Sequence, residues 1–197
     1  MSRCPLESRG TAHIRRHALR EPHPAVTNDA DQVRTLLDKL EIHEVLARYA
    51  RGIDRRDWAL VRSCYHDDAI DDHGAYRGDV DGFIAWVAER HAGIEQSMHF
   101  LGNTLIELDG DVAFSETYLT TFAHETRPGT PTRYAHSGCR YVDRLERRDN
   151  GPWKFAERHV VFEFSHVSDE STGRERLGGR EVAQRSRDDL VYRIRGG

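Results

Sequence analysis

The chain has 197 residues, of which 38% are hydrophobic and 31% are charged, and its formal net charge is −4. A chain of this length usually builds one core, so we expect a single domain with polar tails. The segments 1–28 and 168–197 carry net charges of +3 and +1, which leaves −8 on residues 29–167; this acidic core argues against a nucleic-acid-binding protein, which would present a basic face to phosphates.

Both ends of the chain have the composition of tails. Residues 1–28 hold five arginines against two glutamates and three of the six prolines, without apolar periodicity, and we expect them to be disordered. Residues 168–197 hold seven arginines against six acids among scattered glycines. They are expected to form a flexible charged tail, although the apolar residues near the end could dock on a neighbour. The folded domain is therefore expected at 29–167.

Helices are expected in the first half of the domain. The Asn-Asp pair at 28–29 can cap a long amphipathic helix, because apolar residues recur at three- and four-residue steps as far as Ile53. A short helix is predicted at 58–65, a hairpin at 69–76 and a third helix at 80–91. This half of the domain thus supplies one long helix and two shorter ones.

Long alternating runs fill the second half. We predict strands at 98–108, 112–124, 132–147 and 153–166, separated by the turn segments DGD, RPGTP and RDNGP. Helices followed by consecutive strands are typical of the α+β class. We expect a cone-shaped barrel in which a strongly curved, mixed or antiparallel sheet wraps around the helices. The open end of such a cone is a preferred site for small molecules.

Three stretches of sequence carry a resemblance to a known family. They are EIHEVLARYARGIDRRDW, SMHFLGN and GCRYVDRLERRDNGPWKFAERHVVF. With them, residues 31–166 resemble the SnoaL-like branch of the nuclear-transport-factor-like superfamily, which includes scytalone dehydratase, a dehydrochlorinase, a bile-acid dehydratase, ketosteroid isomerase and polyketide cyclases. The resemblance implies the same cone-shaped fold.

The resemblance also implies an active site. A histidine that opens the first long strand acts as base in the dehydratase members, and an aspartate near the end of the first helix orients it; His99 and Asp54 match these positions. Tyr49 and Arg158 match a tyrosine and an arginine that line the same cavity. One extra residue in the RDNGPW turn leaves the register open, and His159 takes the place of Arg158 if the register slips.

The residue types fit acid–base chemistry. Histidine is the side chain whose pKa starts nearest to neutral, and a carboxylate bonded to its ring fixes the tautomer and stabilises the imidazolium. His99 is then the base, Asp54 its orienting partner, Tyr49 the acid for a departing hydroxyl, and Arg158 a clamp for an anion or carbonyl. From spacing alone, a histidine in this position is more often a hydrogen-bonded polar group in the core, and the resemblance is what favours a catalytic role for His99.

Strand alternation and family position together suggest the pocket walls. These residues have an apolar share that suits a small, hydrophobic, ring-bearing substrate. The predicted substrate-binding residues are Asn103, Ser137, Cys139, Tyr141, Val160 and Phe162.

Cofactors and metals are not expected. Cys4, Cys64 and Cys139 are widely spaced and form no CxxC pair, so we treat them as free thiols rather than as disulfides or a zinc site. The segment HDD at 66–68, with His73 nearby, could suggest a metal site, but adjacent residues point apart and a solvated turn explains the acids better.

The function that follows is a cofactor-independent dehydratase-type lyase or isomerase. A polyketide-cyclase-like or hydroxylase-like enzyme and a non-catalytic small-molecule-binding or assembly module on the same fold are the alternatives. No apolar run approaches the roughly 20 residues of a membrane-spanning helix, so we expect a cytoplasmic protein that binds neither membrane nor nucleic acid. The outer sheet face suits a homo-oligomer, a dimer or a trimer.

Overall fold

The computed structural model describes residues 28–126, 133–168 and 181–194. The expected N-terminal tail therefore lies outside the described residues, apart from its last residue. The same holds for residues 169–180 and 195–197 of the expected C-terminal tail.

Helix α1 (Asp29–Arg55) is the longest helix and positions much of the core. Its first turn is capped by Asn28, whose side-chain oxygen accepts a hydrogen bond from the backbone N–H of Asp31 at 2.9 Å. The helix ends at Arg56, which adopts the left-handed conformation with φ 54°. Its second half is buried against the sheet through Ile42, Val45, Leu46, Tyr49 and Ile53.

Two short helices and a hairpin follow α1. Helix α2 (Trp58–Ser63) and strand β1 (Tyr65–Asp72) lead to strand β2 (Arg77–Asp79) and helix α3 (Val80–Arg90). Asp79 caps α3, because its side chain accepts a hydrogen bond from the third residue of the helix. The predicted helix–hairpin–helix order is thus present, with boundaries shifted by a few residues.

Four long strands complete the fold: β3 (Ile94–Asp109), β4 (Val112–Glu125), β5 (Arg133–Arg147) and β6 (Trp153–Ser168). In the described part of the chain, six strands form one sheet in the order β2-β1-β6-β5-β4-β3. Neighbouring strands are antiparallel except β1 and β6, which run parallel, so the sheet is mixed.

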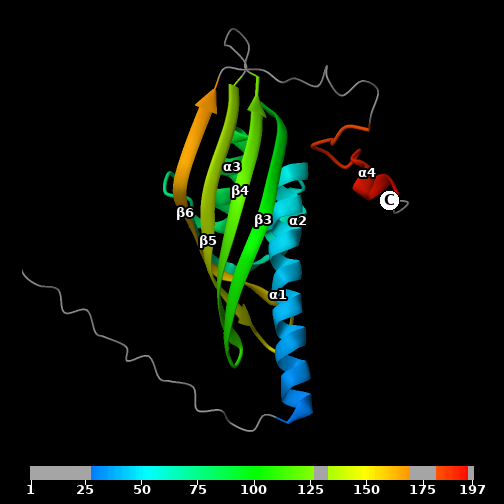
Figure 1. Ribbon diagram of the computed structural model, residues 1–197, viewed down its shortest axis with the longest axis vertical. Coiled ribbons are helices and arrows are strands. Elements are labelled where there is room, and N and C mark those ends of the chain that lie inside the picture. Colours follow the sequence, from blue (N-terminus) through cyan, green and yellow to red (C-terminus); the bar gives the residue numbers. More distant parts are fainter. Residues whose placement is uncertain (1–27, 127–132, 169–180, 195–197) are drawn as a thin grey trace, which may run out of the picture.

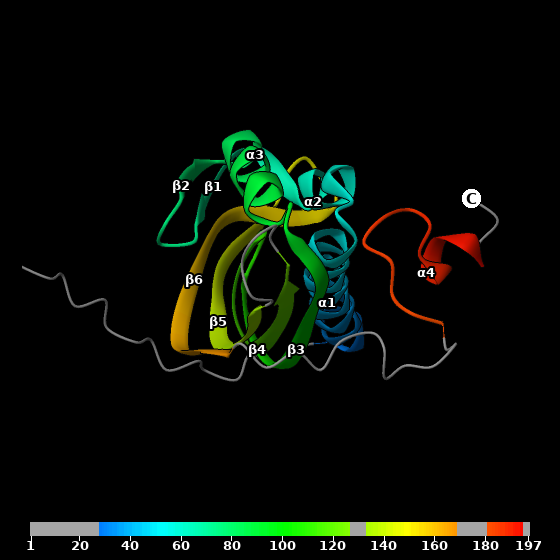
Figure 2. The same cartoon turned by 90° about the horizontal axis from the view of Figure 1, so that it is seen from above.

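The sheet is strongly curved and remains open. Figure 2 shows it bending from β6 through β5 and β4 to β3, with α1 beside β3 and the shorter helices α2 and α3 along another side. The long strands and α1 run along the long axis of the molecule (Figure 1). The α+β fold is confirmed, but β2 and β3 are free edges within the described residues, so the expected barrel is not closed.

Aromatic side chains fill the inside of the curve. Trp153, Phe155, Tyr65 and Phe83 are all fully buried, and the Tyr65 and Phe155 rings lie 5.1 Å apart between centroids. This aromatic core ties strand β6 to the first residue of β1.

The outer face of the sheet is apolar in places. Phe100, Leu105, Phe114 and Tyr118 are exposed there, and the homo-oligomer expected from the sequence stays a prediction. Within the described residues, no helix combines the length and the apolar character needed to cross a membrane.

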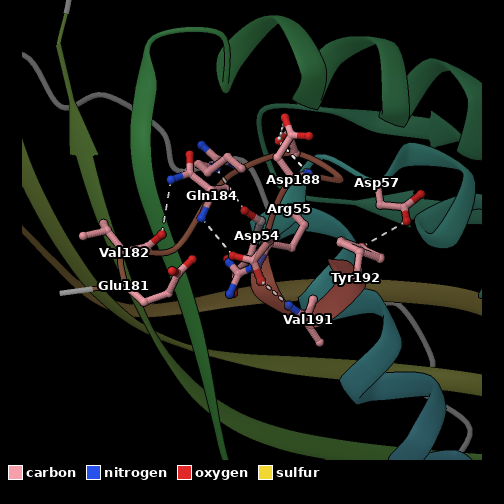
Figure 3. Close-up of polar contacts among 12 residues, drawn as sticks. Asp54, Arg55, Asp57, Glu181, Val182, Gln184, Asp188, Val191 and Tyr192 are labelled. Atoms are coloured by element: carbon pink, nitrogen blue, oxygen red, sulfur yellow. Dashed lines mark hydrogen bonds and ion pairs between the residues drawn. The ribbon is translucent and has the colours of Figure 1, made fainter. Parts of the chain in front are cut away.

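Residues 181–194 of the expected C-terminal tail lie against the end of α1 (Figure 3). The Arg185 guanidinium donates hydrogen bonds to the backbone carbonyls of Ile53 and Asp54, both at 3.1 Å. The Tyr192 hydroxyl, at the end of the short helix α4 (Leu190–Arg193), donates to Asp57 at 3.0 Å. The carbonyls at a helix end have no hydrogen-bond donors within the helix. Arg185 provides donors for two of them.

Candidate active site

Asp54 and His99 form a hydrogen-bonded pair between the last turn of α1 and the first half of β3. The Asp54 carboxylate accepts from Nδ1 of His99 at 2.7 Å and from its backbone N–H at 2.9 Å. The hydroxyl of Ser97 donates to the same carboxylate at 2.9 Å. Three donors thus fix the carboxylate, and the carboxylate fixes the imidazole.

The electrostatics of the pair define which nitrogen is basic. Burial raises the pKa of Asp54, but the hydrogen bonds and the charge of His99 outweigh burial and bring this pKa below its usual value. Asp54 is therefore ionised and can only accept, so Nδ1 of His99 carries the hydrogen. In the neutral imidazole, Nε2 then holds the lone pair that can take a proton.

A glycine allows α1 and α2 to approach where the aspartate lies. A Cβ added to Gly52 would lie 2.6 Å from Cγ2 of Val61 in α2. Glycine at this position therefore lets α2 pack against the turn of α1 that carries Asp54.

The pair opens on a cavity of about 310 Å³. This volume lies at the lower end of the range for small-molecule sites. Its walls come from α1, α3, the segment between β1 and β2, and strands β3 to β6. Six of the residues expected from the sequence line it: Tyr49, His99, Cys139, Tyr141, Val160 and Phe162.

Two of these lining residues, Cys139 and Tyr49, have side chains that stay neutral. Burial raises the pKa of the Cys139 thiol to about 11. Burial also raises the pKa of Tyr49, with a further contribution from the charge of Asp71, while the nearby Arg158 opposes both. Tyr49 therefore keeps its proton, and its hydroxyl lies 3.5 Å from Nε2 of His73.

Arg158 does not line this cavity. Its guanidinium is 0% exposed and forms two hydrogen bonds with Asp143, at 2.7 and 2.8 Å. Its central carbon lies 3.9 to 4.1 Å from the centroids of three aromatic rings, those of Tyr49, Tyr141 and Phe155. The strand alternation does point Arg158 inward and leaves His159 partly exposed. Arg158 lies against the Tyr49 ring in the buried layer beneath the cavity wall, which we call the floor.

Two further expected wall residues lie elsewhere. Asn103 is exposed, because β3 is irregular between Leu101 and Thr104 and the inward alternation resumes at Thr104. Ser137 lines an adjoining cavity and donates a hydrogen bond to the Ser165 hydroxyl at 2.9 Å.

The cavity also has polar residues that the sequence interpretation missed. His73, Arg90 and His91 line it together with Trp86. Asp71, which contacts His73, stands two positions before it, and residues two apart in extended backbone share a face. That spacing is the signal that could have identified the pair.

His91 faces the cavity as a neutral hydrogen-bond donor. Burial, assisted by the charge of Arg185, lowers the pKa of His91 to about 3. Arg185 donates to Nδ1 of His91 at 2.9 Å, so the ring hydrogen lies on Nε2. The C-terminal segment thus sets the tautomer of a residue in the cavity wall.

The residues considered for a metal site have separate partners. His66 contacts the backbone carbonyl of Glu146 at 3.0 Å. Asp67 pairs with Arg62, and Asp68 with a different arginine. Residues 66–68 belong to strand β1 rather than to a turn, so that part of the expectation is wrong, while the exposure of Asp67 and Asp68 agrees with solvated acids.

Comparison with known proteins relates the sequence to a family. The family model of the SnoaL-like domain matches residues 34–159. Uncharacterized protein Rv2910c of Mycobacterium tuberculosis is 28% identical over 130 residues, which cover 64% of this chain and 86% of that protein.

Two solved structures share the fold. Hexachlorocyclohexane dehydrochlorinase LinA-type3 of Novosphingobium barchaimii LL02 is 18% identical with a TM-score of 0.61, over 72% of this chain and 94% of that one. A protein of Novosphingobium aromaticivorans provisionally assigned as a scytalone dehydratase is 14% identical with a TM-score of 0.61, over 72% of this chain and 93% of that one. At such identities the likeness establishes the fold alone.

Proposed function

The chain belongs to the SnoaL-like domain family, and from this premise we propose that it is a cofactor-independent acid–base enzyme, a dehydratase-type lyase or an isomerase. The observation that carries the proposal is the His99–Asp54 pair, hydrogen-bonded at 2.7 Å on the wall of a cavity. A base held by a carboxylate beside an enclosed space is the arrangement that proton abstraction requires.

The chemistry begins at His99. Its Nε2 lone pair removes a proton from a carbon of the substrate, and the Asp54 carboxylate stabilises the imidazolium that forms. Histidine can remove such a proton only when a neighbouring group, such as a carbonyl, makes the C–H acidic. General-base catalysis of this kind contributes about 10²–10⁴-fold to a rate.

The cavity walls indicate the kind of substrate. Tyr141, Val160 and Phe162 give an apolar surface, which favours a small hydrophobic molecule with a ring. The Nε2–H of His91 and the Tyr49 hydroxyl are donors that could stabilise negative charge on a carbonyl oxygen. Arg158 acts from below as a fixed cation under the Tyr49 ring, without contact to substrate.

A substrate screen tests the proposal. The full chain is incubated with ring-bearing alcohols and unsaturated ketones, and elimination or double-bond migration is followed by ultraviolet absorbance and mass spectrometry. We expect His99→Gln to lower kcat by about 10²–10⁴-fold. His43→Gln is the matched control, since His43 is exposed on α1. Turnover by His99→Gln at the wild-type rate would reject His99 as the base.

A further inference from the structure

A second histidine–carboxylate pair lies in the same cavity. Nδ1 of His73, in the segment between β1 and β2, forms a short contact with one carboxylate oxygen of Asp71. The other oxygen accepts a hydrogen bond from the Tyr65 hydroxyl at 2.6 Å. Asp71 is 0% exposed. The pair therefore has the same base-and-carboxylate composition as His99 and Asp54.

Packing fixes the His73 ring. The ring stacks on Phe83 with 4.7 Å between centroids and an interplanar angle of 21°, and Trp86 lies 6.0 Å away. The backbone N–H of His73 donates to the carbonyl of Tyr76 at 2.8 Å. The carboxylate on Nδ1 directs Nε2 the other way, toward the Tyr49 hydroxyl and the cavity.

The two histidines approach the cavity from different parts of the sheet. His99 belongs to β3, at one end of the strand order, whereas His73 follows β1, and three strands separate β1 from β3. Both side chains line the same space. A molecule in the cavity is therefore flanked by two imidazoles, each with its Nδ1 held by a carboxylate.

An elimination needs a proton donor as well as a base when the leaving group is a hydroxyl. Hydroxide is a poor leaving group, so the oxygen must be protonated as its bond to carbon breaks. Tyr49 is a weak candidate, because burial and the charge of Asp71 raise its pKa. Histidine exchanges protons near neutral pH.

We propose that His73 is the second catalytic residue, the proton donor to a departing hydroxyl, and that the substrate class is ring-bearing β-hydroxy carbonyl compounds. This rests on the proposed function, with His99 as base. Asp71 is a positioning residue that acts through His73.

The elimination transfers one proton to His99 and takes one from His73. The C–H bond next to the carbonyl breaks and its proton goes to Nε2 of His99, while the electron pair forms the carbon–carbon double bond. The carbon–oxygen bond breaks, and the oxygen takes the electron pair of that bond and the proton on Nε2 of protonated His73. The products are an unsaturated carbonyl compound and water. Solvent then returns the proton from His99 to His73.

The test compares two leaving groups on one skeleton. The probes are 4-hydroxy-4-phenylbutan-2-one and its acetate ester, which both give 4-phenylbut-3-en-2-one. Acetate leaves without full protonation, so His73→Gln is expected to lower kcat about 10²-fold or more on the alcohol and less than about tenfold on the ester. His99→Gln is expected to lower both to a similar extent, and His43→Gln neither.

The outcomes separate the two proposals. Equal losses on both probes in His73→Gln, or no loss, overturn the role of His73 while His99 stands. An unchanged rate in His99→Gln overturns the base instead. Failure of the wild type to act on either probe rejects the β-hydroxy carbonyl class. Circular dichroism checks the fold of each variant, and if His73→Gln does not fold, Asp71→Asn must show the same preference for the ester.

Discussion

Two similar pairs lie in different surroundings, one on the cavity wall at His99, here called the mouth, and one in the floor beneath that wall. At the mouth, Asp54 is bonded to His99, whose side chain is 13% exposed and borders the cavity. In the floor, Asp143 is bonded to Arg158, and both side chains are 0% exposed. Each carboxylate holds a nitrogen base by hydrogen bonds below 3 Å.

The difference between the pairs shows what makes such a pair suitable for chemistry. Burial would lower the pKa of Arg158, but the charge of Asp143 outweighs it and the pKa lies well above the usual value, so arginine keeps its proton. His99 can exchange a proton and presents a nitrogen to the cavity. A titratable base and access to the cavity therefore distinguish the mouth from the floor.

The largest effect is expected in the floor. Arg158→Met leaves the Asp143 carboxylate buried without its cation, so the free energy of unfolding should fall by about 3–5 kcal/mol in urea titrations. The double variant Arg158→Met with Asp143→Leu should recover most of that loss. A single variant of normal stability that fails only in catalysis would instead support the clamp role that the sequence suggests for Arg158.

At the mouth, removing one partner of the pair should lower turnover rather than stability. Asp54→Asn removes the charge that stabilises the imidazolium and loosens the tautomer of His99, so kcat should drop by about 10²–10⁴-fold. Its free energy of unfolding should change less than that of Arg158→Met. Steady-state kinetics on a substrate found in the screen, together with urea titration, measure both. If Asp54→Asn lowered the free energy of unfolding as much as Arg158→Met does, the two pairs would not differ in role.

A smaller effect involves His91, a histidine at the mouth that is kept neutral by burial and by the charge of Arg185. Its pKa in the folded state is about 3, below the usual value of about 6.5. As pH falls below about 6.5, the unfolded chain therefore gains a proton that the folded state does not, and stability falls.

The variant His91→Gln isolates the contribution of His91 to the pH dependence of stability. Between pH 7 and pH 4.5, His91→Gln should lose about 2 kcal/mol less stability than the wild type, an amount that allows for partial exposure of the ring. Urea titrations at the two pH values provide the comparison. An equal loss in both proteins would show that burial and Arg185 do not lower the pKa of His91.

The fold could be predicted from the sequence because its signals are local. Three- and four-residue apolar spacing predicts α1, and the turns DGD and RDNGP divide the long strands. Alternation also predicts that Arg158 and His159 face opposite ways, and the structure has Arg158 inward. Alternation fails at Asn103, because an irregularity in β3 adds residues that no local pattern announces.

The candidate site depends more on contacts between distant residues. Asp54 and His99 are 45 residues apart, and only the family resemblance brings them together in the sequence. His73 reaches the cavity because β1 pairs in parallel with β6, a pairing that the consecutive strands do not reveal. Arg185 binds carbonyls at the end of α1 more than 130 residues earlier in the chain, within a segment whose composition indicates a tail.

The most direct test of the central claim is the tautomer of His99, measured by ¹⁵N NMR of histidine-labelled protein, with His99→Gln to assign the signal. We expect the neutral ring to carry its hydrogen on Nδ1, bonded to Asp54, and a lone pair on Nε2. Asp54→Ala should weaken this preference. A hydrogen on Nε2 in the wild type would leave no basic nitrogen toward the cavity and would contradict the assignment of His99 as base.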